Sequence, residues 1–217
     1  LSVVYFVVFF FFFEVDSEDL SMVAVFEPDE AVPLPYVLDM VKPAQTVKEA
    51  LINFAFYDYY FYGYPFFGVS GLVLLPLKWL GKLGNISLVM LLLRQLLSVL
   101  PMIASIWVLI ALLDKFQTYK SVVLFLFLGV IPGVVQNNYW WHPDSLAILF
   151  AVLTLFFLHK DDLRLGRFFY LAAFMCGISA AIKGIGFYFF FSILVVLFMS
   201  WNVKKVSLLK VGLAGAG

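Results

Sequence analysis

Long apolar stretches that carry almost no charge constrain what this chain can fold into more than any other feature. The clearest ones follow one another closely, at 91–113, 122–135, 145–158, 168–182 and 185–199. A helix needs about 20 mostly apolar residues to cross the hydrocarbon core of a bilayer. Several stretches are shorter than that, so we expect tilted helices or a locally thinned bilayer. The sequence predicts an all-α, polytopic transmembrane helical bundle.

The composition supports the same conclusion. Hydrophobic residues make up 64% of the chain and charged residues 13%, against about 45–50% and about 25% in soluble domains. A soluble fold of this length could not bury so much apolar surface. The zero formal net charge gives no indication of nucleic-acid binding. Cys176, the single cysteine, lies in an apolar stretch and is predicted to be a packing residue.

The chain before residue 87 divides differently. Residues 1–13 are apolar and uncharged, which predicts the end of a first span. Residues 14–82 hold most of the acids and prolines and many tyrosines, so we expect a long external loop. Its last part, 66–82, is apolar but interrupted by glycines and a proline, which favours a helix lying at the interface. Further spans occupy 87–217, and we expect a single module, 1–217, that is truncated at both ends.

The distribution of basic residues orients the spans. With residue 13 outside and each clear span crossing once, loops 114–120, 159–167 and 202–210 face inside. They hold three acids (Asp114, Asp161 and Asp162) and eight basic residues: Lys115, Lys120, Lys160, Arg164, Arg167, Lys204, Lys205 and Lys210. The other face holds six basic residues and eleven acids, which is the asymmetry expected of cytoplasmic and non-cytoplasmic loops.

Polar groups from distant parts of the sequence are therefore predicted on the outer face. Asp29 and Glu30 lie in the first loop, and His142 and Asp144 follow two tryptophans between the third and fourth spans. Arg94 is expected at the outer end of the second span, and Lys183 at the outer turn between the fifth and sixth. Such convergence is what an interfacial active site requires, although an ordinary membrane topology also produces polar loops.

The order of these features resembles the membrane glycosyltransferases of the GT-C fold, in particular bacterial and archaeal relatives of dolichyl-phosphate-mannose protein mannosyltransferases (glycosyltransferase family 39). The resemblance extends along nearly all 217 residues. It rests on an ordered set of short motifs: Asp29-Glu30, Tyr62-Gly63-Tyr64-Pro65, Arg94 before an apolar span, Pro143-Asp144-Ser145-Leu146, and a glycine-containing span that ends in Lys183-Gly184. The chain departs from some relatives at Glu27, where they carry His, and it lacks the family's C-terminal part.

The resemblance implies transfer of a sugar from a polyprenyl-phosphate donor to an acceptor at the extracellular or lumenal face of the plasma membrane or ER membrane. Asp29 is then the candidate base and Glu30 a supporting or acceptor-orienting group. Arg94 and Lys183 are candidates for the carrier phosphate. His142, Asp144 and Tyr64 are candidates for substrate binding. The sugar, the acceptor (a protein, lipid or glycan) and a divalent metal stay open.

Each candidate also has a structural interpretation. Asp29 and Glu30 would be solvated loop acids, and Asp144 would cap a helix that starts at Ser145. Arg94 and Lys183 would extend to the interface. The tryptophans and the loop tyrosines are interpreted first as anchors at the membrane interface. The acidic run of Glu14, Asp16, Glu18 and Asp19 reads as a solvated flank, with a metal site as the alternative.

Two other classes of protein remain as alternatives. A transporter or channel is disfavoured because the expected spans are nearly free of mid-depth charges and broken helices. A non-catalytic membrane subunit or degenerate transferase is the other alternative.

Overall fold

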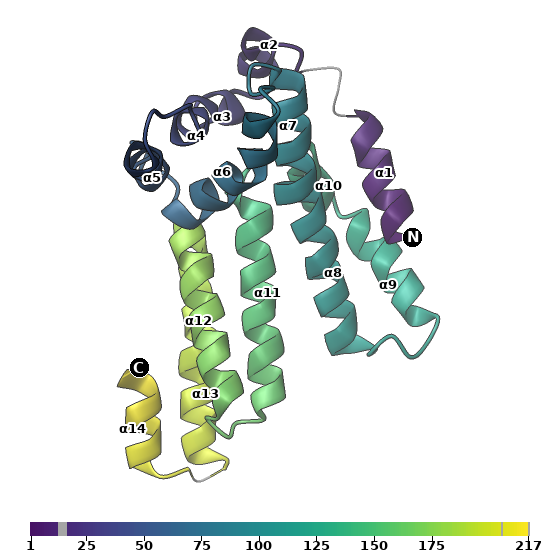
Figure 1. The fold of residues 1–217 in the computed structure, drawn as a ribbon. Helices are drawn as coiled ribbons and strands as arrows, with labels where there is room; N and C mark the ends of the chain where they lie inside the picture. The colour runs from purple at the N-terminus through teal and green to yellow at the C-terminus, as the bar shows by residue number, and fades with distance from the viewer. Residues whose placement is uncertain (13–16, 205, 217) are drawn as a thin grey trace. The chain divides into compact units, whose positions relative to one another are not determined.

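The computed structural model describes residues 1–12, 17–204 and 206–216 (Figure 1). All regular secondary structure in this part of the chain is helical. The described residues form two compact units: Leu1–Ile103 with Phe127–Leu146, and Ala104–Leu126 with Ala147–Gly217. Two long helices each contribute residues to both units.

The first unit is built mainly from short helices of the expected external loop. After α1 (Ser2–Phe12), the loop folds into α2 (Leu20–Phe26), α3 (Pro28–Ala31), α4 (Leu34–Met40) and α5 (Val47–Ala55), followed by α6 (Tyr64–Trp79). Asp19 caps α2 by accepting from Met22 N at 2.9 Å, and Thr46 caps α5 through Glu49 N at 3.1 Å. Capping of this kind satisfies backbone N–H groups that have no partner within their own helix.

A long composite helix follows the loop. It begins with α7 (Ile86–Arg94), continues through a π-helical turn, η1 (Gln95–Val99), and ends with α8 (Leu100–Leu113). The π-helical turn directly precedes Pro101, which has no N–H to donate and whose ring crowds the preceding turn. Together these segments form a helix of 28 residues. Arg94 therefore lies more than two turns inside this helix, whereas the sequence placed it at the outer end of a span starting at residue 91.

The segment predicted as one span over 122–135 is broken. It forms α9 (Lys120–Gly129) and α10 (Pro132–Tyr139), whose axes differ by 63°. Ile131 is extended because the following proline disfavours the helical conformation, and Pro132 then starts the new helix. Tyr5 of α1 contacts this region: its hydroxyl donates to the Gly129 carbonyl at 2.8 Å and accepts from Asn138 Nδ2 at 2.7 Å.

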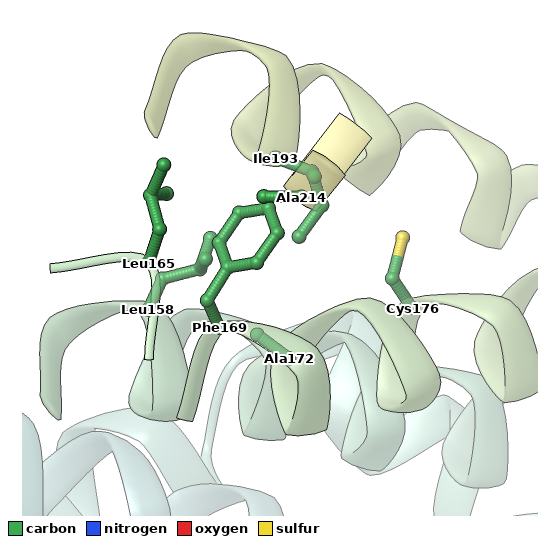
Figure 2. Close-up of a cluster of buried hydrophobic side chains, with 7 residues drawn as sticks. All are labelled: Leu158, Leu165, Phe169, Ala172, Cys176, Ile193 and Ala214. Atoms are coloured by element: carbon green, nitrogen blue, oxygen red, sulfur yellow. The ribbon is translucent and has the colours of Figure 1, made fainter. Parts of the chain in front are cut away.

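The second unit contains the remaining helices. Besides residues 104–113 of α8 and 120–126 of α9, they are residues 147–161 of α11 (Pro143–Asp161), α12 (Arg167–Ile182), the 3₁₀ turn η2 (Gly184–Phe189), α13 (Phe190–Asn202) and α14 (Leu208–Ala216). Its core is a cluster of buried apolar side chains: Leu158, Leu165, Phe169, Ala172, Cys176, Ile193 and Ala214. Figure 2 shows the Phe169 ring extending toward Ile193 and Ala214. Cys176 lies in this cluster, which confirms that it is a packing residue.

Three described helices are long and apolar enough to cross a membrane: Ile86–Leu113, Pro143–Asp161 and Gly184–Asn202. A fourth is added if the bent α9–α10 pair counts as one span. These helices indicate a multi-pass membrane protein. Arg167–Ile182 is apolar but only 16 residues long. The expected interruption of 66–82 is not observed, because α6 runs continuously through its glycines and Pro76.

Candidate functional site

A buried ion pair lies at the centre of the first unit. The Glu30 carboxylate is fully buried and the Arg94 side chain is 2% exposed. Arg94 Nε donates to Glu30 Oε1 at 2.9 Å, and its Nη2 donates to Oε2, so the contact is bidentate. Such planar pairs are both strong and geometrically specific. The backbone N–H of Trp141 also donates to Glu30 Oε1. One carboxylate therefore joins α3, α7 and the segment before α11.

The local sequence explains how Glu30 and Asp29 come to differ. Pro28 starts the single-turn helix α3, and Asp29 and Glu30 occupy its first turn. Neighbouring residues on a helix point in different directions. Glu30 is consequently buried against Arg94, whereas the adjacent Asp29 is exposed. The prediction that Glu30 supports Asp29 stays a prediction, and this geometry favours it over a solvated loop acid for Glu30.

A second group of polar side chains, Tyr62, His142 and Asp144, lies in the same unit. The Tyr62 hydroxyl is 2.9 Å from His142 Nε2, and His142 Nδ1 is 3.1 Å from Asp144 Oδ2. His142 Nδ1 makes no hydrogen bond within the described residues, so the hydrogen bond between Nε2 and the Tyr62 hydroxyl is the one that holds the imidazole. Trp140 stacks on the His142 ring with centroids 4.8 Å apart. These contacts fix the orientation of the imidazole.

The pKa of Tyr62 reflects its buried environment. Burial raises the pKa of Tyr62 to about 12, with smaller contributions from Tyr59 and from the negative charges of Asp29 and Asp144. Burial likewise raises the pKa of Tyr59, again with contributions from Tyr36 and Asp29. Asp29 is thus close enough to both phenols to act on them electrostatically. The structure brings Asp29 and Asp144, which are far apart in sequence, to the same group of side chains.

Trp141 is a structural residue of this site. Its ring is fully buried and stacks on Phe66 with centroids 5.0 Å apart. Its indole N–H donates to Ser70 Oγ at 3.1 Å, and Ser98 Oγ donates to the Trp140 carbonyl at 2.6 Å. The prediction that both tryptophans form an interfacial belt is therefore wrong for Trp141. Its buried indole instead holds the turn that carries His142.

One further prediction is corrected at Asp144. Helix α11 begins at Pro143 rather than Ser145, so Asp144 lies inside the first turn, not at the cap. Tyr64 is 40% exposed, and its hydroxyl donates to the Phe54 carbonyl at 3.4 Å. The role of Tyr64 in substrate binding stays a prediction, and Tyr62, two positions earlier, is the tyrosine that contacts His142.

Lys183 belongs to the second unit. It ends α12, and its backbone N–H donates to the Ser179 carbonyl. The Ser179 hydroxyl, one turn earlier, donates to the carbonyl of Ala147 at 2.9 Å. The end of α12 that carries Lys183 therefore lies beside the first turns of α11 within this unit.

The described residues contain no group of three His, Cys, Asp or Glu side chains arranged to hold a metal ion. His142 and Asp144 form only a pair. Glu14 and Asp16 of the acidic run lie outside the described residues, as does Lys205 of the last inside loop. Asp19 serves as a helix cap, which supports a structural interpretation for that residue.

Tyr62, Ser70 and Trp141 are parts of the site that were not among the predicted site residues, although Tyr62 begins the Tyr62-Gly63-Tyr64-Pro65 motif. Tyr62 was one of five tyrosines with the same pattern, and Trp141 one of two adjacent tryptophans. Nothing in the sequence distinguishes the buried member of either set. Comparisons with protein-family models, curated proteins and solved structures found no match for this chain.

Proposed function

We propose that the chain is part of a membrane glycosyltransferase that moves a sugar from a polyprenyl-phosphate donor to an acceptor at the non-cytoplasmic face. The observation that carries the proposal is the contrast at residues 29 and 30. An exposed carboxylate, Asp29, directly precedes a buried one, Glu30, which is held by Arg94 and Trp141. A catalytic base must reach its substrate and must also be fixed in position. This arrangement meets both requirements.

The reaction assigned to Asp29 is a single displacement. Its carboxylate accepts the proton of an acceptor hydroxyl as that oxygen bonds to the anomeric carbon of the sugar. The bond from the anomeric carbon to the phosphate oxygen breaks, and the polyprenyl phosphate leaves with the electron pair. The configuration at the anomeric carbon inverts.

The other residues of the first unit take supporting roles. Glu30 and Arg94 position Asp29, because both oxygens of Glu30 accept from Arg94. Arg94 is buried in that pair, so we place it in positioning. Lys183 belongs to the second unit, and its contact with the carrier phosphate stays a prediction. His142, held by Tyr62 and close to Asp144, is the proposed group for binding substrate hydroxyls.

The experiment compares two variants of the full-length protein reconstituted in liposomes with a radiolabelled polyprenyl-phosphate sugar. Asp29→Asn removes the base and is expected to lower the transfer rate about 10²–10⁴-fold. Asp39→Asn is the matched control, since Asp39 is an exposed acid of the same loop whose carboxylate pairs with Lys42 at 3.6 Å. Equal rates in wild type and Asp29→Asn remove Asp29 from the mechanism. No transfer by wild type from any donor favours the non-catalytic alternative.

One observation favours transport as a second candidate. The bent α9–α10 pair introduces a broken helix, and α10 carries Asn137 and the buried Asn138. Discontinuous helices with polar residues are typical of substrate sites in transporters. Uptake of a labelled sugar or lipid-linked sugar into the same liposomes, unchanged by Asp29→Asn and lost on Asn138→Leu, would support this candidate over sugar transfer.

A further inference from the structure

A pocket of about 420 Å³ lies within the second unit, between the ends of α8 and α11. Three of its lining side chains carry or can carry positive charge: Lys115, His159 and Lys160. Phe116 and Phe156 provide aromatic walls. Ala111 and Leu112, in the last turn of α8, complete the lining. No carboxylate of the described residues lines the pocket.

The nearby acids are engaged elsewhere. Asp161 is buried and accepts from the backbone N–H groups of Leu165, Gly166 and Phe169. Asp114 accepts from the hydroxyls of Thr118 and Ser121. Asp162 pairs with Lys204 at 3.3 Å and Arg164 at 3.7 Å. Within the described residues, neither Lys115 nor Lys160 forms an ion pair with a carboxylate. Both lysines are therefore left without a direct carboxylate partner in the described part of the chain.

The backbone on one side of the pocket is held in an uncommon conformation. Lys115 and Phe116 have φ of 51° and 57°, so two consecutive non-glycine residues are left-handed. L-residues adopt this region at an energetic cost, and such positions cluster at binding sites. Lys160 is fixed in a different way, because its Nζ lies 4.5 Å from the centroid of the Phe156 ring. Both lysines are thus oriented by the fold at the pocket.

The position of the pocket identifies the ligand class. It lies at the ends of two helices that are long enough to span a membrane, Ile86–Leu113 and Pro143–Asp161. The loops at these ends, 114–120 and 159–167, are the ones that the distribution of basic residues places on the cytoplasmic side. Headgroups of anionic lipids occupy that depth, and basic pockets between transmembrane helices bind them. Helix C-termini alone would favour the lysines slightly but would repel an anion, so any anion must be held by the side chains.

We propose that this pocket binds the phosphate-bearing headgroup of an anionic lipid from the cytoplasmic leaflet. The headgroup phosphate contacts Lys115 and Lys160, and its acyl chains lie along the apolar faces of α8 and α11. The proposal depends on the membrane topology and not on the sugar-transfer reaction.

The test uses the full-length protein in nanodiscs of equal parts phosphatidylcholine and phosphatidylglycerol, followed by native mass spectrometry of the lipids that remain bound. Wild type should retain phosphatidylglycerol over phosphatidylcholine, and Lys115→Gln/Lys160→Gln should lower that retention about 30-fold, since two lysines at about 1 kcal/mol each contribute about 2 kcal/mol. Lys115→Arg/Lys160→Arg should keep it. The matched control, Arg164→Gln/Lys204→Gln, removes two charges outside the pocket, from loops 159–167 and 202–210 of the same predicted face, and should leave retention unchanged.

Three outcomes overturn the proposal. One is equal retention in wild type and Lys115→Gln/Lys160→Gln. Another is an equal loss in the Arg164→Gln/Lys204→Gln control, which would indicate attraction by general surface charge. The third concerns the source of the phosphate: if inorganic phosphate added to nanodiscs of phosphatidylcholine alone binds in a lysine-dependent way and displaces phosphatidylglycerol, the site belongs to a soluble phosphate compound.

Discussion

Among the described residues, each of the two units buries one carboxylate, and the two carboxylates are satisfied in opposite ways. Glu30 of the first unit pairs with Arg94, 64 residues away, and accepts from Trp141 N, 111 residues away. Asp161 of the second unit accepts from backbone N–H groups four, five and eight residues ahead. The first carboxylate fixes distant segments against one another, whereas the second shapes a single turn.

The largest effect is expected at Arg94. Arg94→Met leaves the Glu30 carboxylate buried and unpaired, which should lower the free energy of unfolding by about 3–5 kcal/mol. Equilibrium unfolding of the full-length protein in detergent measures it. Lys82→Met, at an exposed lysine, is the control and should change stability by less than about 0.5 kcal/mol. Glu30→Leu/Arg94→Met should recover most of the loss, because removing both charges removes the penalty. If Arg94→Met lowers the free energy of unfolding by less than about 1 kcal/mol, Glu30 does not depend on its distant partner and the contrast with Asp161 is contradicted.

A smaller and more local effect is expected at Asp161. Asp161→Ala leaves three backbone N–H groups without their acceptor and should cost about 1–3 kcal/mol. Hydrogen exchange should accelerate at the amides of Leu165 and Gly166 and stay unchanged in the first unit. The turn also holds Asp162, Leu163 and Leu165 at positive φ, so losing its acceptor releases strained backbone. Asp162→Asn, at an exposed neighbour that tolerates this conformation, is the control. Faster exchange across both units would show that the two carboxylates act alike.

The smallest effect is expected at Tyr62. Tyr62→Phe removes the hydrogen bond to His142 and should cost about 1 kcal/mol at neutral pH. Because the folded-state pKa of Tyr62 is raised from 10 to about 12, the stability it contributes is intact below pH 10 and is lost as pH rises through 12. Unfolding measured across that range should show a steeper decline for wild type than for Tyr62→Phe. Tyr60→Phe, at an exposed tyrosine, should follow wild type.

The sequence was sufficient to predict the membrane class and most helices, because a span is a local property of about 20 apolar residues. It did not predict the break at residues 130–131, although Pro132 was a signal that a helix ends before it. The pairing of Glu30 with Arg94 could not be read from the sequence, since a contact across 64 residues depends on how the loop helices fold back. The same holds for the choice of Tyr62 over Tyr64 as the partner of His142.

The central claim is that the Asp29 loop and the turn after Lys183 face the same, non-cytoplasmic water layer. Labelling by a membrane-impermeant maleimide tests it in a Cys176→Ala background that carries one new cysteine at a time, at exposed positions Asp39, Gly184 or Gln117. Asp39→Cys and Gly184→Cys should label in intact cells, and Gln117→Cys only after permeabilisation. Labelling of Asp39→Cys and Gly184→Cys from opposite sides would contradict the account.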